Sequence, residues 1–269
     1  MILASHGVIA SQIASFDADA VAFFNRVTTA GGTLSTTEKQ AVNQLVLDLK
    51  ANSLWSAMKA IYPMVGASAE ACKQNLKSSS FTGTFTSGWT FASTGATPNG
   101  TSAHMDTNFI PSSSLSSSAS THMSFYSRTN NDGSFIEMGC DSISSNRLAF
   151  HFKYLGTAYY DQNDFTNGRL SYSMSGINST GFSITSRTSN TLQKAYLNNV
   201  LKGTNTNTIT SNLPNRNFFI GALNFNATIV DRSNRQCAFA SIGDGLTDTQ
   251  AGNFYTAVQA FQTTLSRQV

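Results

Sequence analysis

The stretch Ile242–Phe261, IGDGLTDTQAGNFYTAVQAF, begins like a strand, turns on two glycines and finishes as a helix near the end of the chain. Thr247 and Gln250 are spaced as a capping box, in which the two side chains satisfy free backbone amides of the first helical turn. The helix then carries apolar residues at spacings of three and four: Phe254, Val258, Phe261 and Leu265. Such a helix has one face to bury, and we expect it to lie on the outside or edge of a β structure.

That β structure is predicted between residue 66 and this helix, where short apolar alternations are separated by Gly, Asn, Ser and Asp. Short strands at a spacing of roughly 8–12 residues are typical of a sandwich or jelly roll rather than of alternating β and α units. Turn signals such as Asn131–Gly133 and Asn167–Gly168 separate some of the strands. The serine-rich segment 111–121, PSSSLSSSAST, is expected to be a loop followed by a polar strand.

The sequence before residue 66 is predicted to be helical. Asp17 can cap a first helix that the glycines at 31 and 32 end, and Ser35 and Glu38 form the capping box of a second. The second helix has one apolar stripe, which must pack on something: Ala41, Val42, Leu45, Val46 and Leu49. The segment 53–63, SLWSAMKAIYP, is predicted to be a short third helix that Pro63 ends.

These patterns divide the chain into an N-terminal arm at residues 1–15, a helical unit at 16–65 and a β-sandwich with its closing helix at 66–269. The arm has no Lys or Arg before an apolar core, so it resembles a flexible or docking segment more than a secretory signal.

Composition excludes several classes of function. Charged residues make up 12% of the chain, against roughly 25% in typical globular domains, so hydroxyl and amide groups must keep the surface soluble. The formal charge is only +3 and the sequence contains no run of basic residues, so we expect no nucleic-acid binding. No apolar run reaches the ~18 residues of a membrane span, so we expect no membrane insertion. The cysteines, Cys72, Cys140 and Cys237, are far apart and are expected to be free buried thiols.

The last third of the chain resembles a known fold family. The segments KAYLNNVLKG at 194–203, NFFIGALN at 217–224 and RQCAFASIGDGLTDTQAGNFYTAVQAFQTTL at 235–265 are similar to the closing half of concanavalin A-like or laminin G-like jelly rolls. The resemblance implies a mainly β sandwich closed by a C-terminal helix. Asn199 stands where many relatives have a turn glycine, and asparagine is one of the few residues that accept a positive φ.

A second resemblance covers about residues 16–269. The segments DADAVAFFNRV at 17–27, the run from Ser35 to Gly66 and ASTGATPNGT at 92–101 are similar to structural proteins of tailed phages, especially those of Bacteroidetes hosts. The resemblance implies a non-enzymatic virion protein, assembled in the host cytoplasm and carried on the particle as a head fibre, capsid decoration or tail appendage. A secreted or surface lectin-like carbohydrate-binding module is the alternative.

The virion interpretation also implies partners. We expect contacts with other virion proteins of the capsid, portal or tail, a weak adhesion to host-surface glycans, and a homo-oligomer, either a trimer or a dimer. The N-terminal helices would supply the subunit interface through apolar residues such as Leu45 and Leu49.

Enzymatic chemistry finds little support. Glycosidases of this fold place two or three acids on alternate positions of one strand, whereas Glu137 and Asp141 are four residues apart with no acid midway. We predict no catalytic residues, and we expect Glu137 on the solvent face of a strand. The histidines show no metal-binding spacing: His6, His104, His122 and His151.

The segment 159–168, YYDQNDFTNG, is predicted to be a loop rich in tyrosines, acids and asparagines. Its oxygens could hold Ca²⁺, and the candidate ligands are Asp161, Asp164 and Asn167. Its aromatic and polar groups could contact a glycan, and the candidates are Tyr159, Tyr160, Asp161 and Asn163. An ordinary polar hairpin turn explains the same residues and is favoured, so we predict no resident metal or other cofactor.

Overall fold

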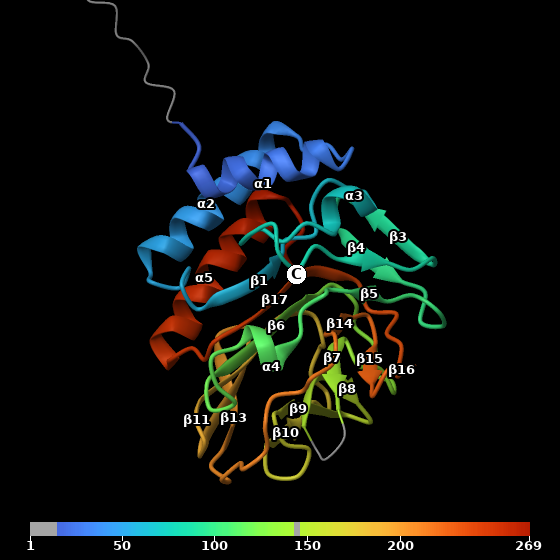
Figure 1. Cartoon of the computed structure of the whole chain (residues 1–269), viewed down its shortest axis with the longest axis vertical. Helices are drawn as coiled ribbons and strands as arrows, with labels where there is room; N and C mark the ends of the chain where they lie inside the picture. Colours follow the sequence, from blue (N-terminus) through green and yellow to red (C-terminus); the bar gives the residue numbers. More distant parts are fainter. Residues whose placement is uncertain (1–14, 143–145) are drawn as a thin grey trace, which may run out of the picture.

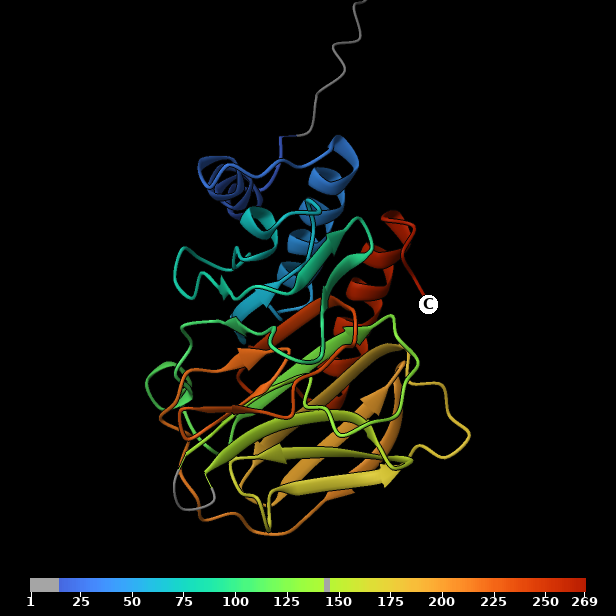
Figure 2. The same ribbon diagram turned by 90° about the vertical axis from the view of Figure 1, so that its right-hand side faces the viewer.

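The computed structural model describes residues 15–142 and 146–269. Within these ranges two mainly antiparallel sheets pack face to face, and helices cover the outer side of one of them (Figure 1 and Figure 2). The predicted mainly β sandwich, preceded by helices and closed by a C-terminal helix, is confirmed. The expected arm at residues 1–15 lies outside the described residues except for its last position.

The helices are α1 (Ala18–Thr29), α2 (Thr36–Ala51), α3 (Ala69–Cys72), α4 (Pro111–Ser114) and α5 (Asp248–Thr264). In the described part of the chain none of them is long and apolar enough to cross a bilayer. Cys72, Cys140 and Cys237 are free and buried, as predicted.

We name the helix-covered sheet A and the other sheet B. Sheet A has the order β13 (Val200–Asn205), β12 (Leu192–Leu197), β11 (Gly181–Ser189), β6 (Thr121–Ser127), β17 (Cys237–Gly243), β4 (Gly95–Pro98) and β3 (Trp89–Ala92), and β1 (Met58–Tyr62) also pairs with β17. Sheet B has the order β10 (Arg169–Ser173), β9 (Thr157–Gln162), β8 (Arg147–Tyr154), β7 (Met138–Asp141), β14 (Phe219–Ile220), β5 (Met105–Asp106) and β2 (Thr84–Phe85). The hairpin of β15 (Leu223–Phe225) and β16 (Thr228–Val230) joins sheet B beside β7.

The central strands of sheet A are buried on both faces, whereas sheet B is buried on one. Between the sheets, Phe125 of β6, Ile242 of β17 and Phe150 of β8 belong to one apolar cluster. On the opposite side of sheet A, Phe182 and Phe239 belong to a second apolar cluster that includes residues of α1, α2 and α5. Strands β6 and β17 are therefore buried at every position, and this includes their polar residues such as His122, Ser124 and Ser241.

The closing helix α5 has the predicted start and the predicted packing. Thr247 and Gln250 form the capping box, and the Phe254 ring lies edge-on 5.2 Å from Phe182 and 5.9 Å from Phe239. α5 therefore covers the outer face of sheet A, as the apolar spacing of its residues indicated.

The second helix packs in the same layer. The Ser35–Glu38 capping box is present, and α2 lies beside α5 (Figure 1). Leu45 and Leu49 are buried, with exposed fractions of 1% and 0%. The expectation that these two leucines form a subunit interface is therefore wrong, because they already fill the core between the helices and sheet A.

The predicted third helix at 53–63 is wrong, because this segment forms strand β1 along the edge of β17. Met58 and Ile61 enter the helix-side core, whereas Ala60 and Tyr62 enter the core between the sheets. An irregularity in the pairing between Met58 and Ala60 shifts the alternation, so the apolar spacing imitates that of a helix.

Two loop predictions had different outcomes. The β12–β13 turn places Asn198 and Asn199 at φ values of 49° and 65°, so asparagine does replace the turn glycine there. In the serine-rich segment, the short helix α4 occupies part of the expected loop, and the strand β6 begins only at Thr121.

The C-terminal end is held by a buried arginine. Arg267 is 1% exposed, and its guanidinium donates to the carbonyl oxygens of Pro63 at 2.6 Å, Met64 at 2.7 Å and Ala238 at 2.7 Å. These carbonyls follow β1 and lie in β17, so Arg267 joins the chain end to the centre of sheet A. Burial lowers the pKa of Arg267 to about 10, which leaves it charged at neutral pH.

We predict that Arg267→Ala lowers the free energy of unfolding by about 3 kcal/mol or more, because three buried carbonyls lose a charged donor. Urea denaturation followed by tryptophan fluorescence measures the change. Gln268→Ala, at an exposed neighbouring position, is the control and should change stability by less than about 0.5 kcal/mol. Equal stability of both variants would contradict this role of Arg267.

Candidate functional site

The segment expected to be a ligand-binding loop is half strand, because Tyr159–Gln162 belong to β9. A strand points consecutive side chains to opposite faces, so Tyr160 enters the core and is 0% exposed. Its hydroxyl lies 2.9 Å from Ser183 Oγ. Asn163 is equally buried and donates to the Ser118 carbonyl at 2.6 Å. Of the glycan candidates, Tyr160 and Asn163 thus face the protein interior.

The acids of this segment are also bound within the protein. The buried Asp161 carboxylate accepts from Arg169 Nε at 2.7 Å and pairs with Arg147 Nε at 3.0 Å. Asp164 accepts from the backbone amides of Thr166 and Asn167 at 2.7 and 2.9 Å, which closes the turn. In residues 15–142 and 146–269 no group of three or more His, Cys, Asp or Glu side chains is suited to hold a metal ion.

Tyr159 remains as the one glycan candidate of the four that is not buried. It projects from β9 on the outer face of sheet B, opposite to Tyr160. The sequence pattern could not separate these neighbours, because the separation depends on the segment being a strand rather than a loop.

The expectation that Glu137 faces solvent is wrong. Glu137 is 1% exposed, and its carboxylate accepts from Phe152 N at 2.6 Å and from Arg235 Nε at 3.1 Å. Arg235 is itself buried and comes from a segment 98 residues away in the sequence, a pairing that no local pattern indicates. The Glu137 carboxylate is therefore part of a buried ion pair.

A histidine–serine chain does form, but it is sealed inside the protein. His122 Nε2 lies 3.1 Å from Ser241 Oγ, which lies 2.7 Å from Ser124 Oγ. His122 Nδ1 lies 2.6 Å from the Asp244 carbonyl. All three side chains are 0% exposed, so no substrate reaches them, and burial lowers the pKa of His122 to about 4.

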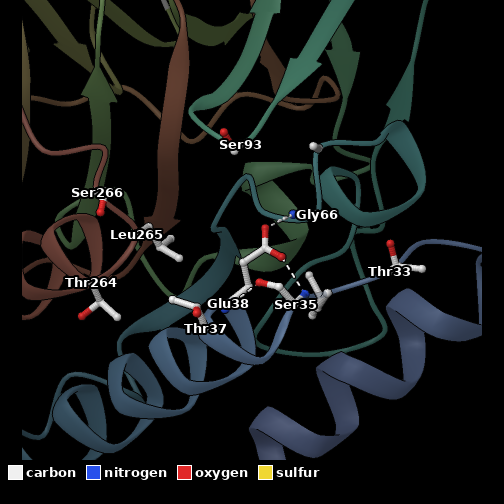
Figure 3. Close-up of a pocket in the computed structure, with 11 residues that line it drawn as sticks. Thr33, Ser35, Thr37, Glu38, Gly66, Ser93, Thr264, Leu265 and Ser266 are labelled. Atoms are coloured by element: carbon white, nitrogen blue, oxygen red, sulfur yellow. Dashed lines mark hydrogen bonds between the residues drawn. The ribbon is translucent and has the colours of Figure 1, made fainter.

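A surface cavity of about 620 Å³ lies between the start of α2 and the end of α5. Glu38 points into it and accepts from Ser35 N at 2.8 Å and Gly66 N at 2.7 Å (Figure 3). The carboxylate therefore ties α2 to the loop at Gly66. The other labelled side chains are hydroxyls such as Ser93 and the apolar Leu265 (Figure 3). The lining includes no aromatic ring and no charged group besides Glu38.

A second cavity of about 390 Å³ has a different lining, and we name it the Asp106 pocket. It lies where β5, β14 and β15 meet in sheet B, and its principal lining residues are Asp106, Arg216, Asn217, Phe219 and Asn224. The Phe219 ring packs 4.6 Å from the His104 ring.

Hydrogen bonds fix the polar groups of the Asp106 pocket in place. Asn217 Nδ2 donates to both Asp106 oxygens, at 3.1 and 2.8 Å. Asn224 Nδ2 donates to the Asn217 carbonyl at 2.9 Å, and Arg216 Nη2 donates to Asn226 Oδ1 at 2.7 Å. Side chains that already hold one another lose little conformational entropy when a ligand arrives.

Strand register brings these residues together. Phe219 is the Cα partner of Asp106, so the two side chains share the outer face of sheet B. The β15–β16 turn places Asn226 and Ala227 at φ values of 47° and 72°, and Asn224 Oδ1 accepts from Ala227 N at 2.9 Å. Sequence analysis missed this site because Asp106 and Asn217 are 111 residues apart.

The Asp106 pocket combines one carboxylate, one guanidinium, three amides and one aromatic ring that is 7% exposed, so it carries both acceptors and donors and little net charge. A sugar hydroxyl both donates and accepts, and the apolar face of a sugar ring packs on aromatic and aliphatic side chains. Ligand sites of a few hundred Å³ with a few fixed polar groups are typical of small-molecule binding. The pocket can therefore hold a neutral, hydroxyl-rich ligand.

No family model and no curated protein matches the chain. Solved structures do resemble it in fold. Domain 4 of AbnA, a GH43 extracellular arabinanase from Geobacillus stearothermophilus, in complex with arabinotriose, is 16% identical with a TM-score of 0.54, over 73% of this chain and 97% of that chain. The binding domain of botulinum neurotoxin serotype D is 14% identical with a TM-score of 0.50, over 76% of this chain and 52% of that chain. At these identities the likeness shows that the fold is a β-sandwich of the class to which these domains belong.

Two histidines, the buried His122 and the partly buried His151, predict a pH dependence of stability. Burial is the main cause that lowers the pKa of both His122 and His151 to about 4, below the ordinary value of 6.5. In this pH range the unfolded chain therefore binds more protons than the folded chain. The free energy of unfolding falls as the pH falls from about 6.5 to about 4. The slope approaches about 1.4 kcal/mol per pH unit for each histidine.

Urea denaturation at pH 7, 6 and 5 measures this slope. His122→Asn should be less stable than the wild type at pH 7 and should lose less stability between pH 6 and 5, because one of the histidines with a lowered pKa is gone. An unchanged slope in His122→Asn would assign the pH dependence to other groups.

Proposed function

We propose that this protein is a non-enzymatic carbohydrate-binding module whose Asp106 pocket holds a neutral sugar residue. The proposal rests on one observation: hydrogen bonds hold several polar side chains in place beside the Phe219 ring in one surface cavity. These side chains are Asp106, Asn217, Asn224 and Arg216. The fold likeness to an arabinanase domain solved with arabinotriose supports the proposal. The Glu137 and His122 clusters, which are buried, support a binding role rather than a catalytic one.

We further propose that the module acts on a phage particle, as a head fibre, capsid decoration or tail appendage that adheres to glycans. This setting rests on the resemblance of residues 16–269 to tailed-phage structural proteins. Many copies on one particle raise the effective concentration of weak sites, so a modest affinity at each pocket is sufficient for adhesion. A secreted lectin-like module with the same pocket is the alternative setting.

The pocket is tested with Asp106→Asn, which keeps the shape of the side chain and removes its charge. A glycan array of neutral oligosaccharides identifies a ligand for the wild-type chain, and calorimetric titration measures its affinity. We expect Asp106→Asn to bind at least tenfold more weakly, a loss of about 1.4 kcal/mol or more, because a carboxylate is the stronger acceptor for a sugar hydroxyl.

Asp48→Asn is the matched control, because Asp48 lies on α2 in the helix layer, and its affinity should equal that of the wild type. Melting temperatures of both variants show whether the fold is kept. Absence of binding to every neutral glycan, or equal binding by Asp106→Asn, would contradict the assignment of the pocket.

The virion setting has its own test. We expect mass spectrometry of purified particles of the encoding phage to detect this chain at a fixed ratio to the major capsid protein, and the ratio distinguishes a head decoration from a tail appendage. Absence from washed particles, with the protein free in the lysate, would favour the secreted lectin.

A further inference from the structure

A second group of exposed aromatic and charged side chains lies on the outer face of sheet B. We name Tyr159, Phe165 and Arg169 the aromatic–arginine platform. Strand pairing connects it to the Asp106 pocket through one row of Cα partners, which runs Phe219, Gly139, Ala149, Asp161 and Arg169. Neighbouring strands are about 4.8 Å apart, so four steps place Arg169 about 19 Å from Phe219.

The β15–β16 hairpin separates the two places. Leu223 of β15 packs in a small cluster with Ile136 and Ala149, and Val230 of β16 packs against it. This cluster fills the middle of the row, so the platform is a site of its own rather than an extension of the Asp106 pocket.

Asp161 fixes the orientation of Arg169. The carboxylate accepts from Arg169 Nε at 2.7 Å and from Nη2 at 2.9 Å, which is a two-point contact. The guanidinium carbon lies 4.3 Å from the Phe165 ring centroid and 5.3 Å from the Tyr159 ring centroid. The hydrogen bonds to Asp161 raise the pKa of Arg169, so the group is charged throughout the physiological range.

The Asp161 carboxylate is buried, whereas the Arg169 guanidinium lies at the protein surface. The Asp161 side chain is 0% exposed, whereas Arg169 is 30% and Phe165 is 43% exposed. Arg169 Nη1 donates no hydrogen bond to any group of the described residues. The guanidinium lies over one side of each ring, so a ligand meets the parts of the Phe165 and Tyr159 rings that remain in solvent, together with an oriented guanidinium edge that has an available donor. The Asp161 charge remains below the surface.

The charges around the platform balance, because Arg147 and Arg169 pair with Asp161 and Asp141, and Arg169 is the most exposed of the four groups. Arg147 pairs with the same Asp161 carboxylate at 3.0 Å, so two guanidinium groups share it. His151, whose ring centroid is 6.2 Å from that of Tyr159, is held neutral at pH 7 by burial and by the repulsion of both arginines, which lower its pKa to about 4. Asp141 pairs with Arg147 at 3.6 Å on the far side from Arg169 and is also largely buried.

We propose that the aromatic–arginine platform binds a carboxylate-bearing sugar residue, with the sugar ring packed on Phe165 and Tyr159 and the carboxylate bound to Arg169. Guanidinium and carboxylate match in geometry and charge, and the rings take the apolar face of the sugar. The platform goes beyond the neutral-sugar function of the Asp106 pocket and does not depend on it.

The test uses tetramers of galacturonate, glucuronate and mannuronate, together with the methyl ester of each, titrated against the whole chain. The wild type should bind at least one acidic tetramer saturably, and its affinity should fall with added salt. Phe165→Ala and Arg169→Gln should each weaken binding at least tenfold. Phe165→Ala keeps the experiment interpretable if Arg169→Gln is unstable, because Phe165 is an exposed side chain outside the core clusters.

Lys39→Gln is the charge-matched control, since it removes one positive charge from α2, and Asp106→Asn is the control for the other site. Both should bind the acidic tetramer like the wild type. The proposal is overturned if no acidic tetramer binds, if the methyl esters bind equally well, or if Lys39→Gln loses as much affinity as Arg169→Gln. If only Asp106→Asn loses affinity for the acidic tetramer, acidic sugars bind in the Asp106 pocket and the platform proposal is overturned. If the wild type binds no neutral sugar, the proposed function of the Asp106 pocket fails but the result for the platform is unaffected.

Discussion

The architecture depends on the burial of the central strands of sheet A on both faces, with β17 among them. β17 pairs with β6 along one edge and with β1 and β4 along the other, and all of its residues are buried. A strand in this position cannot leave a backbone amide or carbonyl unpaired without a large cost. The N-terminal helical segment must therefore deliver β1 to the edge of β17, and α5 must fold back over the same sheet immediately after it.

The covering of sheet A determines where binding can occur. Because α2 and α5 occupy the outer face of sheet A, the sheet face left for solvent in the described structure is that of sheet B (Figure 2). Its outward side chains include Asp106, Tyr159 and Arg169, while its inward neighbours Met105, Tyr160 and Leu170 fill the core. The alternation that builds the core thus presents polar and aromatic groups to solvent in register.

Local signals in the sequence predicted local structure well. The capping residues of α2 and α5, the asparagine turn after β12 and the sandwich itself follow from interactions within a few residues or from strand periodicity. The errors concern contacts between distant segments. β1 is a strand because β17 is beside it, Glu137 is buried because Arg235 reaches it, and the Asp106 pocket forms from segments that meet only in the folded sheet. A single sequence carries no measure of such pairings, so the candidate site was not predictable although most of the fold was.

The few charged side chains are used in two distinct ways. Arg267 and Arg235 are buried, and most of their donors bind backbone carbonyls and fixed side chains, so they position loops and the chain end. Arg169 is also fixed by a buried acid but keeps part of its surface in solvent. With a formal charge of only +3, the protein has a weak overall field to attract ligands from a distance. The ligand binding that we propose on sheet B would then come from short-range, oriented hydrogen bonds and ring contacts, which give modest affinity at one site and would become effective in the proposed setting of many copies on one particle.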